Sequence, residues 1–99
     1  MSDRPALLDA DAVRAALAAL PGWEWRDDAL HKQWDFGDFG RACGFLVGLA
    51  VAAAELDHHP DWSGVYGRVT LALSTHDAGG VTELDLELAR RAEALADPS

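Results

Sequence analysis

The chain has 99 residues, 49% of them hydrophobic and 25% charged, which is typical of one globular domain and argues against disorder. The formal net charge of -9 disfavours binding to nucleic acid or to an anionic membrane surface, because both are negatively charged. The lone Cys43 cannot form an internal disulfide, and neither a signal-peptide pattern nor a full membrane span is found, so a cytoplasmic location is predicted.

The first predicted element is a helix that follows Asp9, a suitable N-cap. Its apolar residues recur at helical spacing, namely Val13, Ala16, Leu17 and Leu20. Pro21-Gly22 then ends the helix. Residues 1–7 are predicted to be a loose lead-in to a single domain that spans residues 1–99.

Two strands around an Asp27-Asp28 turn are predicted next, over residues 23–26 and 29–36. In the second strand Leu30, Lys32, Trp34 and Phe36 share one face. Asp38 is a candidate cap for the longest helix, from Phe39 to about Asp57. Gly44 and Gly48 lie four residues apart in this helix, which favours close packing of a neighbour.

Pro60 disfavours helix at the residue before it, so the long helix is expected to end at or just before His59. Strands are predicted over residues 63–66 and 69–75. Thr82-Glu83-Leu84-Asp85 has the form of a capping box and opens a last helix. The order α-β-β-α-β-β-α predicts an α+β fold, a four-stranded antiparallel sheet with helices packed on one face and free sheet edges.

Histidines at loop positions are the strongest candidates for chemistry. His58 and His59 follow the long helix, and His76 lies between a strand and Gly79-Gly80. Imidazole exchanges protons readily near neutral pH. From spacing alone, solvated surface histidines remain an alternative, and so does a zinc site, although two adjacent histidines rarely point at one metal. Asp85 has an alternative structural role, since an acid in the first turn stabilises a helix N-terminus.

A pattern of separated segments runs through the second half of the chain, and its members are 57–62 (DHHPDW), 65–66 (VY), 68–69 (RV), 73–77 (LSTHD), Gly80 and Asp85. Residues 21–23 (PGW), 32–34 (KQW) and 38–39 (DF) extend it upstream. Together they cover roughly residues 20–95 and resemble the pterin-4a-carbinolamine dehydratase family. The family signature places His-His-Pro, an aromatic residue, a further His and an Asp at the spacings of His58, His59, Pro60, Tyr66, His76 and Asp85.

The resemblance implies a lyase without cofactor or metal that dehydrates 4a-hydroxytetrahydropterin to quinonoid dihydropterin, in recycling of the pterin used by aromatic amino acid hydroxylases. By the same resemblance His58 and His76 are expected to be the acid–base pair, and His59 to bind and orient the pterin. The substrate-binding residues that it implies are Trp23, Asp57, Thr75 and Asp85. It also implies a homodimer formed by sheet extension or a homotetramer formed through helices.

One position departs from the family pattern. Ala54 stands four residues before His58, where the family usually has Glu. A carboxylate there is expected to hold His58 in one tautomer, so the departure predicts a less well oriented histidine. Glu55 is rotated about 100° around the helix and should not substitute for it. The alternative function is a non-catalytic assembly or dimerisation protein of the same fold, in which one of the three histidines would be expected to be lost; none is.

Overall fold

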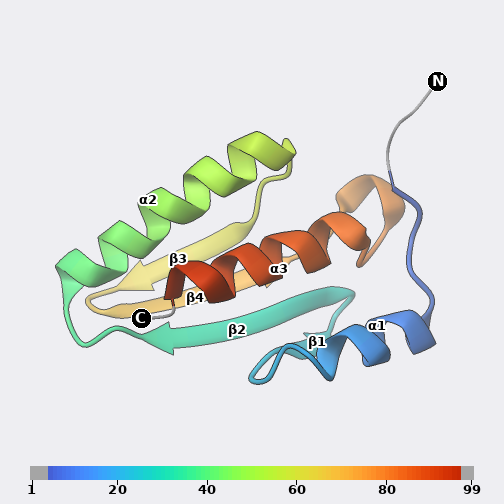
Figure 1. Cartoon of the computed structure of the whole chain (residues 1–99), viewed down its shortest axis with the longest axis horizontal. Helices are drawn as coiled ribbons and strands as arrows, with labels where there is room; N and C mark the ends of the chain where they lie inside the picture. The colour runs from blue at the N-terminus through green and yellow to red at the C-terminus, as the bar shows by residue number, and fades with distance from the viewer. Residues whose placement is uncertain (1–4, 97–99) are drawn as a thin grey trace.

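A computed structural model describes residues 5–96 and contains three α-helices, four strands and one short 3-10 helix. In chain order the elements are α1 (Ala10–Leu17), β1 (Glu24–Arg26), β2 (Ala29–Asp35), α2 (Phe39–Leu56), β3 (Asp61–Val65), β4 (Arg68–Leu73), η1 (His76–Ala78) and α3 (Glu83–Ala96) (Figure 1). The predicted order α-β-β-α-β-β-α is therefore confirmed. The predicted lead-in lies partly outside the described residues, and its described part, residues 5–7, has no regular secondary structure.

The four strands form one antiparallel sheet in the order β1-β2-β4-β3, so that β1 and β3 are its edges. Asp27 and Asp28 join β1 to β2 with φ of 53° and 60°, which is the left-handed backbone of a tight hairpin turn. In the central pair Leu30 lies opposite Leu73 and Trp34 opposite Val69. The predicted hairpin and its alternation are confirmed.

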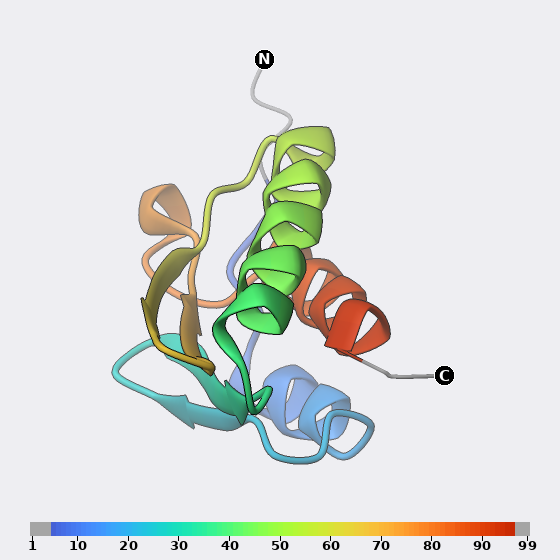
Figure 2. The same ribbon diagram turned by 90° about the vertical axis from the view of Figure 1, so that its left-hand side faces the viewer.

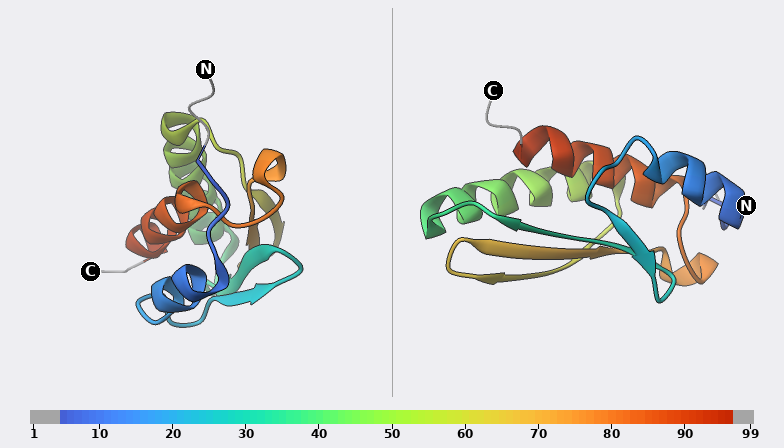
Figure 3. Two further views of the ribbon diagram at one scale, coloured as in Figure 1. Left: turned by 90° about the vertical axis from the view of Figure 1, so that its right-hand side faces the viewer. Right: turned by 90° about the horizontal axis from the view of Figure 1, so that it is seen from below.

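All three helices lie over one face of the sheet, and the other face is left open (Figures 2 and 3). The sheet residues under the helices include Leu30, Val69, Leu71 and Leu73, all of which are fully buried. Phe45 and Leu49 of α2 and Leu88 of α3 complete the core from the helical layer. The predicted two-layer α+β architecture is confirmed.

The long helix α2 begins as expected, because the Asp38 side chain accepts a hydrogen bond from the Arg41 N–H at 2.7 Å. It is long and apolar enough to cross a membrane by length and composition. Its buried residues, however, pack on the sheet and on α3, as in the core helix of a folded domain. Gly48 allows this approach, since a Cβ there would lie 2.8 Å from a Leu95 methyl group, whereas Gly44 has no neighbour within 4 Å.

Several boundaries and one helix face differ from the sequence prediction. α1 ends at Leu17 rather than Leu20, because the chain turns before Pro21-Gly22. β3 begins at Asp61, directly after Pro60, and not at Ser63. In α3 the sequence spacing predicts one buried face made of Leu84, Leu88, Ala92 and Leu95. The buried residues are instead Asp85, Leu86, Leu88, Ala89 and Ala92, and Leu95 is 43% exposed, so the core-facing side is rotated toward Asp85 and Ala89.

Candidate functional site

A pocket of about 240 Å³ opens where the chain leaves α2 and where it leaves β4. Its lining residues are Asp57, His58, His59, Ser74, Thr75, His76 and Asp77. Two segments distant in sequence are thus brought together, because β4 is a central strand and α2 packs across the same sheet. All three candidate histidines of the second half of the chain contribute to this one pocket.

The first wall of the pocket depends on how α2 ends. The His58 N–H donates to the Ala53 carbonyl at 3.0 Å and the Asp57 N–H to the Ala54 carbonyl at 3.2 Å, which together form a Schellman motif. Asp57 occupies the left-handed position of this motif, with φ 50° and ψ 45°, where glycine is the usual residue. The chain therefore leaves the helix axis at Asp57, and His58 does not continue a face of α2.

The second wall is a closed loop after β4. The Thr75 N–H donates to the Gly80 carbonyl at 2.8 Å, and the Ala78 and Gly79 N–H groups donate back to the Thr75 carbonyl at 3.0 Å each. Gly79 closes the short η1 turn with φ 80°. This loop buries the Thr75 side chain and leaves His76 exposed at the pocket.

Asp85 lies behind the pocket and is fully buried. Its Oδ1 lies 2.5 Å from His58 Nε2, in a hydrogen bond between the two side chains, and its Oδ2 accepts from the Thr75 hydroxyl at 2.9 Å. Oδ2 also accepts from the Thr82 N–H at 2.8 Å, which is the bond expected of a capping box. The two interpretations of Asp85, helix cap and support of a histidine, are therefore both realised by one carboxylate.

The geometry separates the histidines into two kinds. His58 is buried, and one of its ring nitrogens is fixed by Asp85, so the ring is held in one orientation. His59 and His76 are exposed at the rim. A pocket with one oriented imidazole and two exposed ones has groups for both donating and accepting a proton within reach of a bound molecule.

Trp23 lies apart from these residues. Its ring is buried in the core and packs edge-on against Trp34, with ring centroids 5.6 Å apart. Its Nε1–H donates to Glu93 Oε2 at 3.1 Å, near the other end of α3. The structure therefore does not bring Trp23 to the pocket, whereas Asp57 and Thr75 line it and Asp85 supports it.

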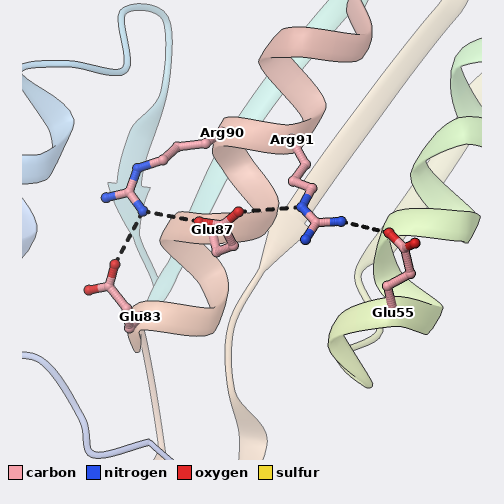
Figure 4. Close-up of polar contacts among 5 residues, drawn as sticks. All are labelled: Glu55, Glu83, Glu87, Arg90 and Arg91. Atoms are coloured by element: carbon pink, nitrogen blue, oxygen red, sulfur yellow. Dashed lines mark hydrogen bonds and ion pairs between the residues drawn. The ribbon is translucent and has the colours of Figure 1, made fainter.

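Glu55, the neighbour of Ala54, points toward Arg91 of α3, as Figure 4 shows, and is not among the residues that line the pocket. Its Oε1 accepts from Arg91 Nη1 at 2.7 Å, and Glu87 accepts from Arg91 Nε at 3.3 Å. The hydrogen bonds from Glu55 and then Glu87 raise the pKa of Arg91 above its ordinary value, so this guanidinium stays charged. The prediction that Glu55 does not replace a carboxylate at position 54 is consistent with this pairing.

Sequence reasoning identified Thr82 as a helix cap only, but its fully buried hydroxyl also contacts the Thr75 hydroxyl at 2.7 Å. The Gly79-Gly80 pair in the sequence could have predicted this contact, because a turn there reverses the chain and brings Thr82 beside the end of β4. Ser74 and Asp77 are further lining residues, which belong to the family pattern at residues 73–77 but were not predicted as site residues. Within residues 5–96 no group of three or more His, Cys, Asp or Glu is placed to hold a metal ion.

The sequence of this chain is similar over most of its length to a known protein family. A family profile described as pterin 4 alpha carbinolamine dehydratase matches residues 6–95. A protein from Opitutus terrae named as a pterin-4-alpha-carbinolamine dehydratase is 48% identical over 93 residues, covering 93% of this chain and 96% of its own. A protein from Rhizobium etli with the same name is also 48% identical and covers 90% of both chains.

Two solved structures share the fold. A transcriptional coactivator/pterin dehydratase from Brucella melitensis superposes with a TM-score of 0.88 at 42% identity, covering 91% of this chain and 98% of its own. A pterin dehydratase-like protein identified as a RuBisCO assembly factor in the alpha-carboxysome has a TM-score of 0.64 at 26% identity, covering 78% and 89%. With the profile spanning nearly the whole domain and the three histidines gathered at one pocket, this chain belongs to the pterin-4-alpha-carbinolamine dehydratase family.

Proposed function

We propose that this protein dehydrates 4a-hydroxytetrahydropterin to quinonoid dihydropterin and water, with histidines as general acid and base. The observation that carries the proposal is the convergence of His58, His59 and His76 on one pocket in a member of this family. The biological role that fits is recycling of tetrahydrobiopterin or a related pterin in the cytoplasm.

The reaction moves protons and involves no oxidation. The C4a–O bond breaks, and the departing hydroxyl needs a proton to leave as water. The electrons that replace this bond come from a ring nitrogen, which must lose its own proton. His58 and His76 are the proposed acid–base pair, and His59 at the rim binds and orients the pterin. Each such proton transfer contributes about 10²–10⁴-fold to the rate.

The direct test mixes the purified protein with chemically prepared 4a-hydroxytetrahydropterin and follows its dehydration against buffer. Catalysis should survive exhaustive chelation, because protonation and not a metal activates the leaving group in this proposal. A dehydration rate equal to that in buffer would reject the proposed activity. Activity that is lost on chelation and restored by zinc would instead support a metal-dependent mechanism.

An assembly or dimerisation role without catalysis is the alternative, since the relative named as a RuBisCO assembly factor shares the fold. This chain matches it at 26% identity but matches the protein named as a dehydratase from Opitutus terrae at 48%. The three histidines are also retained. A folded protein without dehydratase activity would favour the assembly role.

Self-association is part of the proposal. The edge strand β3 exposes Trp62 and Val65 beside unpaired backbone groups, and α2 exposes Val47 and Val51 near an apolar groove of about 420 Å³ between α2 and α3. Sheet edges and apolar helix faces of this kind are where small domains associate. Light scattering should report a dimer or tetramer, and a monomer at micromolar concentration would contradict this.

A further inference from the structure

We infer that a one-way chain of hydrogen bonds, from Thr82 through Thr75 to Asp85, holds His58 as its Nε2–H tautomer and makes Nδ1 of His58 the base. The second half of this inference rests on the proposed dehydration, whereas the tautomer itself does not. Thr75 and Thr82 then act as positioning residues, which changes the substrate-binding role that the family resemblance implies for Thr75.

The direction of these hydrogen bonds follows from the number of hydrogens that each hydroxyl can donate. A threonine hydroxyl has one hydrogen to donate. The Thr75 hydroxyl donates that hydrogen to Asp85 Oδ2, 2.9 Å away, so in its 2.7 Å contact with Thr82 it must accept. The Thr82 hydroxyl therefore donates to Thr75, and it accepts in turn from the Leu84 N–H at 3.3 Å.

The chain of hydrogen bonds ends on the Asp85 carboxylate. Oδ2 receives the Thr75 hydroxyl and the Thr82 N–H, so one oxygen already has two donors. An ionised carboxylate only accepts, so the group that faces Oδ1 must donate as well. That group is Nε2 of His58, which therefore carries a hydrogen.

The consequence is an assignment of roles. With a hydrogen fixed on Nε2, the neutral ring has its lone pair on Nδ1, which is the nitrogen left to take a proton from a molecule in the pocket. Asp85 stabilises the imidazolium that results, because the carboxylate is fully buried and already oriented. His58 is then the base, and the exposed His76 is the acid that protonates the leaving hydroxyl.

The tautomer can be tested without substrate. The ¹⁵N resonances of the imidazole should show a hydrogen on Nε2 and none on Nδ1 when His58 is neutral, with the His58 signals identified by their loss in His58→Gln. In Asp85→Asn the two donors at Oδ2 should hold the amide oxygen there and turn the NH₂ group toward His58. Nε2 must then accept, so the hydrogen should move to Nδ1.

Kinetics provide a second readout. Asp85→Asn should lower kcat by about 10²–10⁴-fold, the usual contribution of a general base. Thr75→Val should lower kcat with little change in KM. Thr75→Ser should keep the kcat of the unchanged protein, because serine retains the hydroxyl. Thr82→Val should show a smaller loss of the same kind. Thr70→Val, on the open face of β4, is the matched control and should behave as the unchanged protein.

Two results would overturn the inference: a wild-type His58 with its hydrogen on Nδ1, or an Asp85→Asn variant that keeps it on Nε2. A rise in KM without loss of kcat in Thr75→Val would return Thr75 to substrate binding. If the expected tautomers are found but no dehydration is catalysed, the hydrogen-bond chain stands and the proposed function fails.

Discussion

Helix α3 carries two carboxylates that each collect donors from other elements, but only one of them leads to a pocket. Asp85, in the first turn, holds His58, which lines the pocket. Glu93, about 12 Å further along the helix axis, accepts from Lys32 Nζ at 2.7 Å and from Trp23 Nε1 at 3.1 Å. Both clusters tie the helical layer to the rest of the fold.

The difference lies in the donors. Around Asp85 the last donor is an imidazole, which exchanges protons near neutral pH. Around Glu93 they are an indole, which only donates, and the ammonium of Lys32, the sole lysine of the chain. Lys32 also donates to the Pro21 carbonyl at 3.1 Å, and its Nζ lies 5.1 Å from the Trp34 ring centroid. The ammonium group therefore has its partners within the fold. The Asp85 cluster is therefore suited to chemistry and the Glu93 cluster to stability.

The largest expected effect is at the pocket. Replacing His58 or His76 by Ala should lower turnover by about 10²–10⁴-fold, because each removes a proton-transfer group. The free energy of unfolding should fall far less in His76→Ala than in His58→Ala, because His76 is exposed and His58 is buried. Steady-state kinetics and urea unfolding of the same preparations measure the two effects. Wild-type turnover in both variants would mean that the histidines are not the acid and base.

The matched change in the other cluster is Lys32→Met, which keeps the length of the side chain and removes its charge. It should lower the free energy of unfolding by about 1–3 kcal/mol, since the carboxylate of Glu93 loses its charged partner in a largely buried setting. Turnover at a permissive temperature should stay within a factor of two of the unchanged protein. A loss of activity as large as that in His76→Ala would erase the distinction between the two clusters.

Most of the fold was predictable because it depends on local signals. Asp9 and Asp38 cap the helices as expected, and the Asp27-Asp28 turn adopts the left-handed backbone that a tight hairpin needs. The boundaries that moved, at Leu17 and Asp61, depend on turns whose geometry is set by packing. For the same reason the buried side of α3 was predicted imperfectly, because a polar residue, Asp85, faces the interior.

The site was predictable where a family signature was present and unpredictable where roles depend on hydrogen bonds. His58, His59 and His76 meet at one pocket, as expected. Thr82 was not foreseen as part of this cluster, since only the tertiary structure shows its contact with Thr75. Trp23 was predicted to bind the substrate but does not line the pocket. The sequence pattern does not reveal that its indole packs in the core beside Glu93.

A smaller effect is expected at the left-handed end of α2. Asp57→Gly should raise the free energy of unfolding by roughly 1 kcal/mol, because glycine adopts a positive φ without the cost that a Cβ carries. Turnover should fall, because the variant removes a carboxylate from the pocket wall. Asp57→Asn tolerates the same backbone and loses only the charge, so it separates the two contributions. A more stable glycine variant with full activity would show that the carboxylate has no role in the pocket.

The smallest effect is expected for Ala54→Glu, which restores the carboxylate usual in the family. From the sequence, position 54 lies one helical turn before His58 and was expected to share its face. In the structure the helix ends at Leu56, and the left-handed Asp57 carries His58 off that face to Asp85. His58 is thus already oriented without a carboxylate at 54, and the nearby Glu55 is engaged by Arg91. Turnover of Ala54→Glu should change less than tenfold, with the His58 tautomer unaltered. Because Ala54→Gln adds the same bulk without the charge, a tenfold or larger gain in the Glu variant alone would show that a carboxylate there does work that Asp85 cannot.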